Sequence, residues 1–430
     1  MEHSADAITR LVLQLAVILS VAKLGGEISE RYLKTPSVVG ELAAGIIIGP
    51  FALGGVDLPW LGPLFEHAEI GSNEAAGFSI PVSESLWSIA QIGAIILLFN
   101  AGLETNLRQF LRYAGSASLV AIGGAALPFV LGAAATVAFG FADGFTDPTA
   151  LFIGAIFMAT SIGISVRILA DLQRLDTPEG VTILAAAVLD DVLGVLALTI
   201  VIGIAAGGEL SVGSFGLITL KTLGFWVALT GVGILLAKPI SNLFDKFQVS
   251  GGALVLTVAL AFFAASLAES FGLAMIIGAF SMGLALSGTE LSDRMDEPLR
   301  GVVAVFIPIF FVVMGTLVDV STLGGVWTFG IAFTAVAVVG KVVGSAVPAL
   351  VTGFNRHGAL RIGAGMLPRG EVTLIMVGIG ISNGVIEHDL FGISIIMIIV
   401  SAVLAPVILS RSFKTGATGV RSGFSAQLET

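Results

Sequence analysis

The chain has 430 residues, of which 56% are hydrophobic and only 12% are charged. Soluble domains carry about 25% charged residues, so this composition excludes an ordinary water-soluble enzyme. The net charge of −10 and the absence of cysteine exclude a basic nucleic-acid-binding surface, disulfides and thiolate metal sites.

Apolar stretches separated by glycine, proline and charge clusters predict thirteen membrane-spanning helices, since one crossing needs about 20 apolar residues. The stretches are 7–24, 36–54, 84–104, 112–141, 148–172, 178–206, 214–240, 250–270, 272–290, 298–318, 324–351, 358–382 and 388–411. The first lacks the basic start and the cleavage site of a signal peptide, so we expect it to be retained as a helix. The sequence therefore predicts an all-α polytopic membrane protein.

Basic residues gather in alternate connections between these helices, and acidic residues occupy the connections in between. The basic residues in question are Lys23, Arg31, Lys34, Arg108, Arg112, Arg167, Arg174, Lys238, Lys246, Arg294, Arg300, Arg356, Arg361, Arg411, Lys414 and Arg421. By the positive-inside rule, this alternation predicts a multi-pass protein of the plasma membrane with its N-terminus outside. The tail at 412–430 is then cytoplasmic.

Two pairs of predicted helices resemble each other in sequence. Leu42-Ala-Ala-Gly-Ile-Ile-Ile-Gly of the second helix matches Leu273-Ala-Met-Ile-Ile-Gly of the ninth, and Leu97-Leu-Phe-Asn-Ala-Gly of the third matches Phe310-Phe-Val-Val-Met-Gly of the tenth. Corresponding helices are seven spans apart, and an odd shift reverses their direction in the membrane. We therefore expect two inverted six-helix repeats, a pattern typical of transporters. Chance similarity between glycine-rich helices is the alternative.

We expect residues 1–411 to form one membrane transport domain that contains these two repeats. Its expected parts are repeat one at 7–206, a connector helix at 214–240 and repeat two at 250–411.

The same shift pairs the fifth helix with the twelfth, and each is interrupted. Thr160 and Ser161 break one apolar run, and Pro368-Arg-Gly-Glu breaks the other, where proline removes a backbone donor. Interruptions at corresponding positions predict two crossed, discontinuous helices at a transport site. The alternatives are that the two hydroxyls bond their own helix and that Arg369 and Glu371 only neutralise half-helix ends.

Three charged residues lie far inside predicted spans. Asp190 and Asp191 are adjacent in the sixth helix, and Lys341 is central in the eleventh. A charge at the bilayer centre costs about 2.5–3.5 kcal/mol on insertion scales, so these groups need compensation, and Lys341 is the natural counter-charge. Consecutive helical residues diverge by about 100°, so the two carboxylates face different neighbours. The alternatives are acids that merely fill a polar cavity and a lysine that snorkels.

Carboxylate, hydroxyl and carbonyl oxygens are hard ligands that suit a small cation. Because burial away from water favours the protonated form of a carboxyl group, a buried aspartate can hold a proton at one moment and a cation at another. Mutually exclusive occupancy of one carboxylate couples the two fluxes in opposite directions.

Five sequence elements resemble the second cation/proton antiporter superfamily, and within it the NapA- and GerN-type sodium/proton antiporters. They are Asn100-Ala-Gly-Leu-Glu-Thr, Ala159-Thr-Ser-Ile-Gly-Ile-Ser-Val, Ala187-Val-Leu-Asp-Asp-Val-Leu-Gly, Gly340-Lys-Val-Val-Gly and Gly365-Met-Leu-Pro-Arg-Gly-Glu-Val. The resemblance implies exchange of Na⁺ or Li⁺ for H⁺ by an elevator-like mechanism in a homodimer, with no cofactor and no enzymatic reaction. The implied core part is 112–206 and 324–411, and the implied dimerisation part is 7–104 and 250–318.

The resemblance also implies roles for Asp191, Asp190 and Thr160, whereas Ser161, Arg369 and Glu371 are expected to contribute because of their positions at the two breaks. Asp191 is expected to carry the proton and, with Thr160, the transient Na⁺, with Ser161 beside them. Asp190 is expected to pair with Lys341, an arrangement associated with electrogenic exchange. Arg369 and Glu371 are expected to compensate charge at the second break.

Other transport and enzymatic functions remain as alternatives. Kef-type potassium/proton antiporters usually show Gln-Asp in place of Asp190-Asp191 and carry a nucleotide-binding C-terminal domain, whose fingerprint this sequence lacks. GerN-type relatives also handle potassium, so potassium/proton exchange is the main alternative. Sodium-coupled uptake of an organic anion would need a larger polar cavity. An intramembrane aspartyl hydrolase needs carboxylates that converge from different helices, and a buried acid–base pair disfavours an ion channel.

Overall fold

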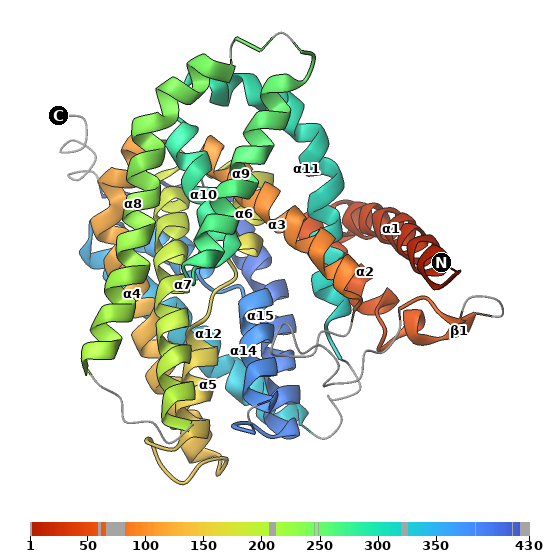
Figure 1. Ribbon diagram of the computed structural model, residues 1–430. Helices are drawn as coiled ribbons and strands as arrows, with labels where there is room; N and C mark the ends of the chain where they lie inside the picture. The colour runs from red at the N-terminus through yellow and green to blue at the C-terminus, as the bar shows by residue number, and fades with distance from the viewer. Residues whose placement is uncertain are drawn as a thin grey trace.

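The structure is a computed structural model that describes residues 2–58, 62–65, 82–205, 212–244, 246–247, 249–319, 326–382, 384–414 and 416–421. Helices make up almost all of it (Figure 1). They are α1 (Glu2–Ile28), the π-helix η1 (Ser29–Leu33), α2 (Ser37–Ile48), the short 3₁₀ turn η2 (Leu53–Gly55), α3 (Glu84–Glu104), α4 (Leu107–Ala138), α5 (Pro148–Met158), α6 (Ile162–Asp171), α7 (Pro178–Ala205), α8 (Val212–Phe244), α9 (Gly252–Ser270), α10 (Met275–Leu286), α11 (Glu290–Thr316), α12 (Trp327–Val351), α13 (Arg356–Gly365), α14 (Glu371–Ser382) and α15 (His388–Lys414). The strands β1 (Asp57–Leu58) and β2 (Gly62–Pro63) form one small antiparallel pair.

Among the described residues, eleven helical segments are long and apolar enough to cross a membrane. Two shorter apolar helices, Met275–Leu286 and Val372–Ile381, accompany them. The protein is therefore an all-helical, multi-pass membrane protein. Both predicted interruptions are present, because the expected helix at 148–172 consists of α5 and α6 and that at 358–382 consists of α13 and α14.

Several helices begin earlier than the apolar pattern predicts, among them α1 at Glu2, and the cause is clear for two of them. Helix α4 begins at Leu107 instead of 112, because the Asn106 side chain accepts hydrogen bonds from two backbone amides of the first turn. Helix α11 begins at Glu290 instead of 298. Its charged first turns are stabilised by ion pairs four residues apart, Glu290 with Arg294 and Asp296 with Arg300. Both extensions are polar, so a search for apolar stretches misses them.

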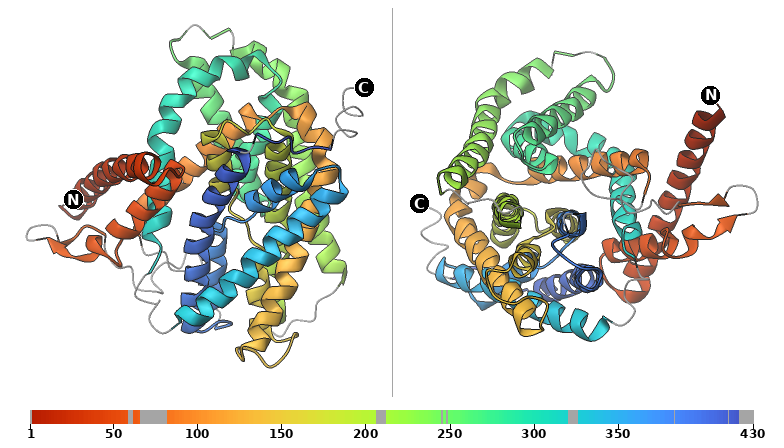
Figure 2. Two further views of the ribbon diagram at one scale, coloured as in Figure 1. Left: turned by 180° about the vertical axis from the view of Figure 1, so that it is seen from behind. Right: turned by 60° about the horizontal axis from the view of Figure 1, so that its bottom comes forward.

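The helices pack into two groups. One group contains α4 to α7 and α12 to α15, and we call it the bundle. The other contains α1 to α3 and α8 to α11, and we call it the scaffold. Close packing occurs mainly within each group, whereas across the boundary α6 contacts α2 and α3, α7 contacts α8, and α15 contacts α2. Figure 2 shows α1 at one edge of the molecule, far from α4.

Glycines allow the scaffold helices to touch backbone to backbone. A Cβ atom added to Gly40 would collide with the Gly25 carbonyl, which fixes α2 against α1. Gly45 of α2 meets Gly315 of α11 in the same way. Because no side chain fits at these points, α2 is held firmly on two sides within the scaffold.

Candidate functional site

The two interrupted helices meet inside the bundle, and polar groups of one break bond the backbone of the other. The Ser161 amide donates to the Pro368 carbonyl at 2.7 Å. The Thr160 hydroxyl donates to the Met366 carbonyl at 3.1 Å, and Ser165 donates to the Gly365 carbonyl at 2.6 Å. These bonds satisfy carbonyls that the broken helix α13 can no longer pair within itself.

Local sequence explains why the fifth helix divides here. Asp147 caps the start of α5 by accepting from the Thr149 amide, and Pro148 occupies the first helical position. Ala159 then adopts an extended conformation that ends the helix. The Ser161 hydroxyl accepts from the Ile164 amide and so starts α6. For Thr160, the alternative of bonding its own helix is wrong, because the described bond goes to the other break.

Two buried cations bind the carboxyl end of α5. Lys341 donates to the Met158 carbonyl, and Arg369 donates to the Phe157 carbonyl at 2.6 Å and to the Leu367 carbonyl at 3.3 Å. Both side chains are fully buried. The carboxyl end of a helix carries partial negative charge, so cations stabilise it. Arg369 therefore neutralises a half-helix end, as its position in the sequence predicted.

Lys341 also forms a two-pronged ion pair with Asp190. Its ammonium lies 3.0 Å from one carboxylate oxygen and 2.9 Å from the other, and neither side chain is exposed. With the Met158 carbonyl as third acceptor, all three N–H groups of Lys341 are satisfied. The predicted pairing of Asp190 with Lys341 is confirmed, and the alternative of a snorkelling lysine is wrong.

Asp191 lies next to this pair along α7 and is 5% exposed. Its carboxylate lies close enough to the Lys341 ammonium for the two charges to interact, more weakly than those of Asp190 and Lys341. Thr160 and Ser161 are 1% and 0% exposed, and Thr160 also lies beside the Asp190 carboxyl group. The structure therefore gathers Asp190, Lys341 and Thr160 at the meeting point of the breaks, with Asp191 adjacent in the sequence. The Glu371 side chain lies outside the described part of the chain, so its predicted role stays a prediction.

Several contributors to the site escape sequence reasoning. The carbonyls of Phe157, Met158 and Met366 are backbone groups, and the identity of their side chains carries no signal for them. Gly124 of α4 is a further case. An added Cβ atom there would collide with the Ser345 hydroxyl and lie 3.9 Å from the Lys341 nitrogen. A glycine in a helix that packs against a predicted buried lysine is the sequence signal that could have indicated Gly124.

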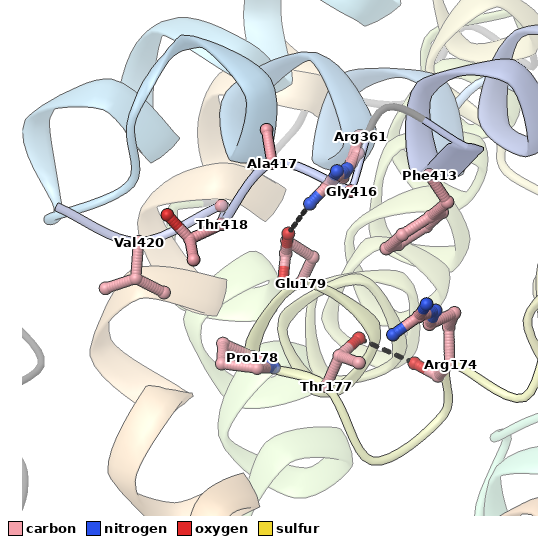
Figure 3. A pocket seen from close by; sticks show the side chains of 11 residues that line it. Arg174, Thr177, Pro178, Glu179, Arg361, Phe413, Gly416, Ala417, Thr418 and Val420 are labelled. Carbon is pink, nitrogen blue, oxygen red and sulfur yellow. Dashed lines mark hydrogen bonds and ion pairs between the residues drawn. The ribbon is translucent and has the colours of Figure 1, made fainter.

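A second buried ion pair lies beside the residues that follow α15. Arg361 of α13 donates to Glu179 of α7 at 2.6 Å, and both side chains are 4% exposed. Figure 3 shows this pair with the Phe413 ring and Arg174 around a pocket of about 510 Å³. Backbone bonds from Asn355 to Gly419 and from Arg421 to Gly353 hold the following segment against the bundle. The pair thus joins α7 and α13 beneath this segment.

We expect Glu179→Gln to destabilise the purified protein by about 3–5 kcal/mol, because it leaves the Arg361 charge buried without its carboxylate partner. Thermal unfolding in detergent measures this loss. Glu290→Gln is the matched control, because the exposed pair of Glu290 with Arg294 lies on the surface of one helix and contributes at most about 1 kcal/mol. Equal shifts in the two variants would contradict the prediction.

Apart from the two buried ion pairs, the structure contains an acidic cavity of about 530 Å³ where the bundle meets the scaffold. Its lining includes Asn100 and Glu104 near the end of α3, Asp176 between α6 and α7, and Asp293 and Asp296 of α11. Asn100 donates to Glu104 at 2.8 Å. Four acids around one cavity create a negative potential that raises the local concentration of cations.

Comparisons with known proteins identify the family of the chain. Residues 16–415 match the family model for the transmembrane part of the sodium/hydrogen exchanger. The high-affinity Na⁺/H⁺ antiporter NhaS3 of Synechocystis is 35% identical, over 94% of this chain and 90% of its own length. The Na⁺/H⁺–K⁺ antiporter GerN of Bacillus cereus is 34% identical, over 93% of this chain and 95% of its own.

The solved structure of the sodium proton antiporter MjNhaP1 from Methanocaldococcus jannaschii has the same fold. It superposes with a TM-score of 0.65 over 95% of this chain and 97% of its own length, at 18% identity. An Na⁺/H⁺ antiporter of Enterococcus hirae is 31% identical over 92% of this chain. The family model matches most of the sequence, and these relatives are similar over most of its length. The chain therefore belongs to the sodium/hydrogen exchanger family.

Proposed function

We propose that the protein is a secondary active antiporter that exchanges Na⁺ or Li⁺ for H⁺ by alternating access, without a cofactor and without covalent chemistry. The observation that carries the proposal is the pair of buried acids Asp190 and Asp191, of which Asp190 is held by Lys341 where the two broken helices meet. We assign the plasma membrane as its location, with the N-terminus outside and the C-terminus cytoplasmic.

The proposed cycle uses Asp191 as the alternating carrier. Its carboxylate binds a proton or a sodium ion but not both, and Thr160 assists the cation with its hydroxyl oxygen. Ser161 orients the break from which Thr160 projects, because its backbone amide donates a hydrogen bond to the Pro368 carbonyl. Lys341 neutralises the charge of Asp190, so the ion pair can move with the bundle at low electrostatic cost. We propose electrogenic exchange, with more protons than sodium ions per cycle. Because Asp191 alone exchanges one proton for one sodium ion, we assign the additional proton to the Asp190–Lys341 pair.

The proposed architecture contains thirteen crossings in two inverted repeats. The eleven long segments together with α10 and the α13–α14 pair give this number. Two glycine contacts support the repeat, because Gly45 of α2 meets Gly315 of α11 and Gly283 of α10 meets Gly102 of α3. The sequence match relates α2 to α10 and α3 to α11, so the helix pair α2–α11 corresponds to the pair α10–α3, and in each pair two glycines touch.

We further propose that the bundle moves against the scaffold and that the scaffold mediates a homodimer. The core at 112–206 and 324–411 corresponds to the bundle. The dimerisation part at 7–104 and 250–318 corresponds to the scaffold helices apart from the connector α8. Limited contact between the groups supports this division, since α6, α7 and α15 make the main contacts that join them.

The acidic cavity at Glu104 and Asp176 supports a cation as the substrate. In the proposed orientation it opens toward the cytoplasm, and its lining residues come from both groups. Such a cavity collects cations before they reach a buried site. It disfavours the uptake of an organic anion, whose carboxylate the same potential would repel.

Cation-resolved exchange in proteoliposomes tests the function. We expect Na⁺ and Li⁺ to dissipate an imposed proton gradient and K⁺ to do so less efficiently, since the relatives NhaS3 and that of Enterococcus hirae carry Na⁺/H⁺ in their names. The name of GerN includes potassium, so K⁺/H⁺ exchange is the alternative outcome. Dissipation by K⁺ alone would favour that alternative, and dissipation by none of the three would reject antiport. Protein-free liposomes provide the control for leakage.

A further inference from the structure

We propose that Arg167 and Asp171 of α6 form, with Ser37 and Glu41 of α2, a latch that joins the bundle to the scaffold in this conformation and opens in each transport cycle. These four residues are the latch cluster. The inference rests on the alternating access of the proposed function. The four residues touch neither the broken helices' meeting point nor the acid pair, so they are positioning residues.

The latch cluster is a closed arrangement of charge-assisted contacts. The Arg167 guanidinium lies 3.6 Å from the Glu41 carboxylate and donates to the Ser37 hydroxyl at 3.0 Å. The same hydroxyl donates to Asp171 at 3.2 Å. Arg167 also pairs with Asp171 along α6 at 3.2 Å. Each residue of α6 therefore reaches α2, and each contact supports the orientation of the next.

Burial strengthens the electrostatic contacts of the latch cluster. The Glu41 side chain is 2% exposed and that of Arg167 is 16% exposed, so water and salt screen the pair only weakly. The loss of one partner leaves a buried charge with poorer compensation. The pairs of Arg294 and Arg300 on α11, in contrast, are exposed and lie within one helix.

Each half of the latch belongs to a rigidly held helix. Glu41 lies between Gly40 and Gly45, the two glycines that fix α2 against α1 and α11. On the other side, α6 begins at the break and is tied to α13 by the bond from Ser165 to Gly365. A movement of the ion site relative to the scaffold therefore pulls directly on the latch cluster.

Packing beside the latch is incomplete. A cavity of about 180 Å³ lies between the two groups, lined by apolar side chains of α2, α6, α11, α14 and α15 and by Arg369 and Gly370 of the second break; the four latch residues lie outside its lining. Interdigitated side chains resist sliding, whereas a gap removes contacts from the surfaces that face it. The polar cluster thus provides a specific contact on a boundary where apolar packing is loose.

A reversible cross-link tests whether the contact opens. The chain contains no cysteine, so Ser37→Cys with Asp171→Cys introduces a single thiol pair across the latch. We expect oxidation to abolish sodium-driven proton movement in proteoliposomes and reduction to restore it. The matched control is Ser29→Cys with Thr35→Cys, whose hydroxyls lie 2.6 Å apart within the scaffold, so that this cross-link does not span the two groups. That cross-link is expected to leave exchange intact.

Cross-linking is verified by mass spectrometry in both variants. Undiminished exchange by the oxidised Ser37/Asp171 variant would overturn the latch, because the contact would not need to open. The unmodified chain separates this result from the proposed function. If it moves no protons in response to sodium, the proposed function fails; if it does so and the cross-linked variant is equally fast, the latch alone fails.

A second experiment needs no cysteine. We expect Arg167→Gln and Glu41→Gln each to change turnover by about tenfold or more, in the same direction, which is about 1.4 kcal/mol in the barrier. The turnover of the double variant should differ from that of the original protein by no more than the larger single effect, because both substitutions remove the same contact between Arg167 and Glu41. Arg31→Gln, which removes the exposed pair with Glu27, is the matched control and should leave turnover unchanged. Unchanged turnover in both single variants, or fully additive effects, would contradict the latch.

Discussion

Replacement of Asp191 by asparagine is expected to abolish sodium-driven proton movement while the fold remains intact. Asparagine has nearly the shape of aspartate but offers neither a negative charge nor a titratable proton. Asp191 is 5% exposed within α7, so no solvent ion can readily substitute for the lost carboxylate. Removal of one buried acid beside the Asp190–Lys341 pair also lowers the electrostatic cost of the fold, so the variant should unfold no earlier than the original protein.

The measurement is the collapse of a proton gradient in proteoliposomes after addition of Na⁺, with thermal unfolding of the same preparation. Asp143→Asn is the matched control, because Asp143 is an exposed acid in the connection between α4 and α5. It should transport normally. Undiminished exchange in Asp191→Asn would reject Asp191 as the carrier, whereas a loss of exchange in both variants would point to a general effect of acid removal.

The fold was predictable to the extent that local chemistry determines it. Pro368 cannot continue a helix, and the hydroxyls of Thr160 and Ser161 compete with helical bonds, so both breaks are visible in the sequence. Helix ends were less predictable, because capping and surface ion pairs set them. The start of α11 at Glu290 is an example, where a charged turn that resembles a loop continues an amphipathic helix.

The site was predictable through its charged side chains and unpredictable through its backbone. Buried charges need partners, so Asp190 and Lys341 indicate each other despite the 151 residues between them. The carbonyls of Met158 and Met366 also bind site residues, but any amino acid supplies a carbonyl. The latch residue Arg167 was interpreted as part of the charge alternation. That rule explains the side of the membrane on which an arginine lies, and it does not predict the contact with Glu41.

Replacement of Lys341 by alanine is expected to weaken or abolish the voltage sensitivity of exchange and to destabilise the protein. The ammonium contributes the charge that neutralises Asp190 and a bond to the carboxyl end of α5. Without it, Asp190 must take up a proton or remain an isolated buried charge, so the net charge that moves in each cycle changes. One elementary charge crossing 100 mV corresponds to about 2.3 kcal/mol, which is large enough to measure. The loss of one partner of a buried pair costs about 3–5 kcal/mol of stability.

Exchange rates at clamped membrane potentials measure the first effect, and thermal unfolding measures the second. The matched control is Lys238→Ala, which removes an exposed lysine of α8 that lies outside the bundle. The double variant Lys341→Ala with Asp190→Ala separates the two effects, because it removes both charges and should recover part of the lost stability without recovering the voltage response. Fully voltage-sensitive exchange in Lys341→Ala would remove the lysine from the coupling. The Asp190–Lys341 pair would then be structural, and a group other than this pair would have to carry the additional proton.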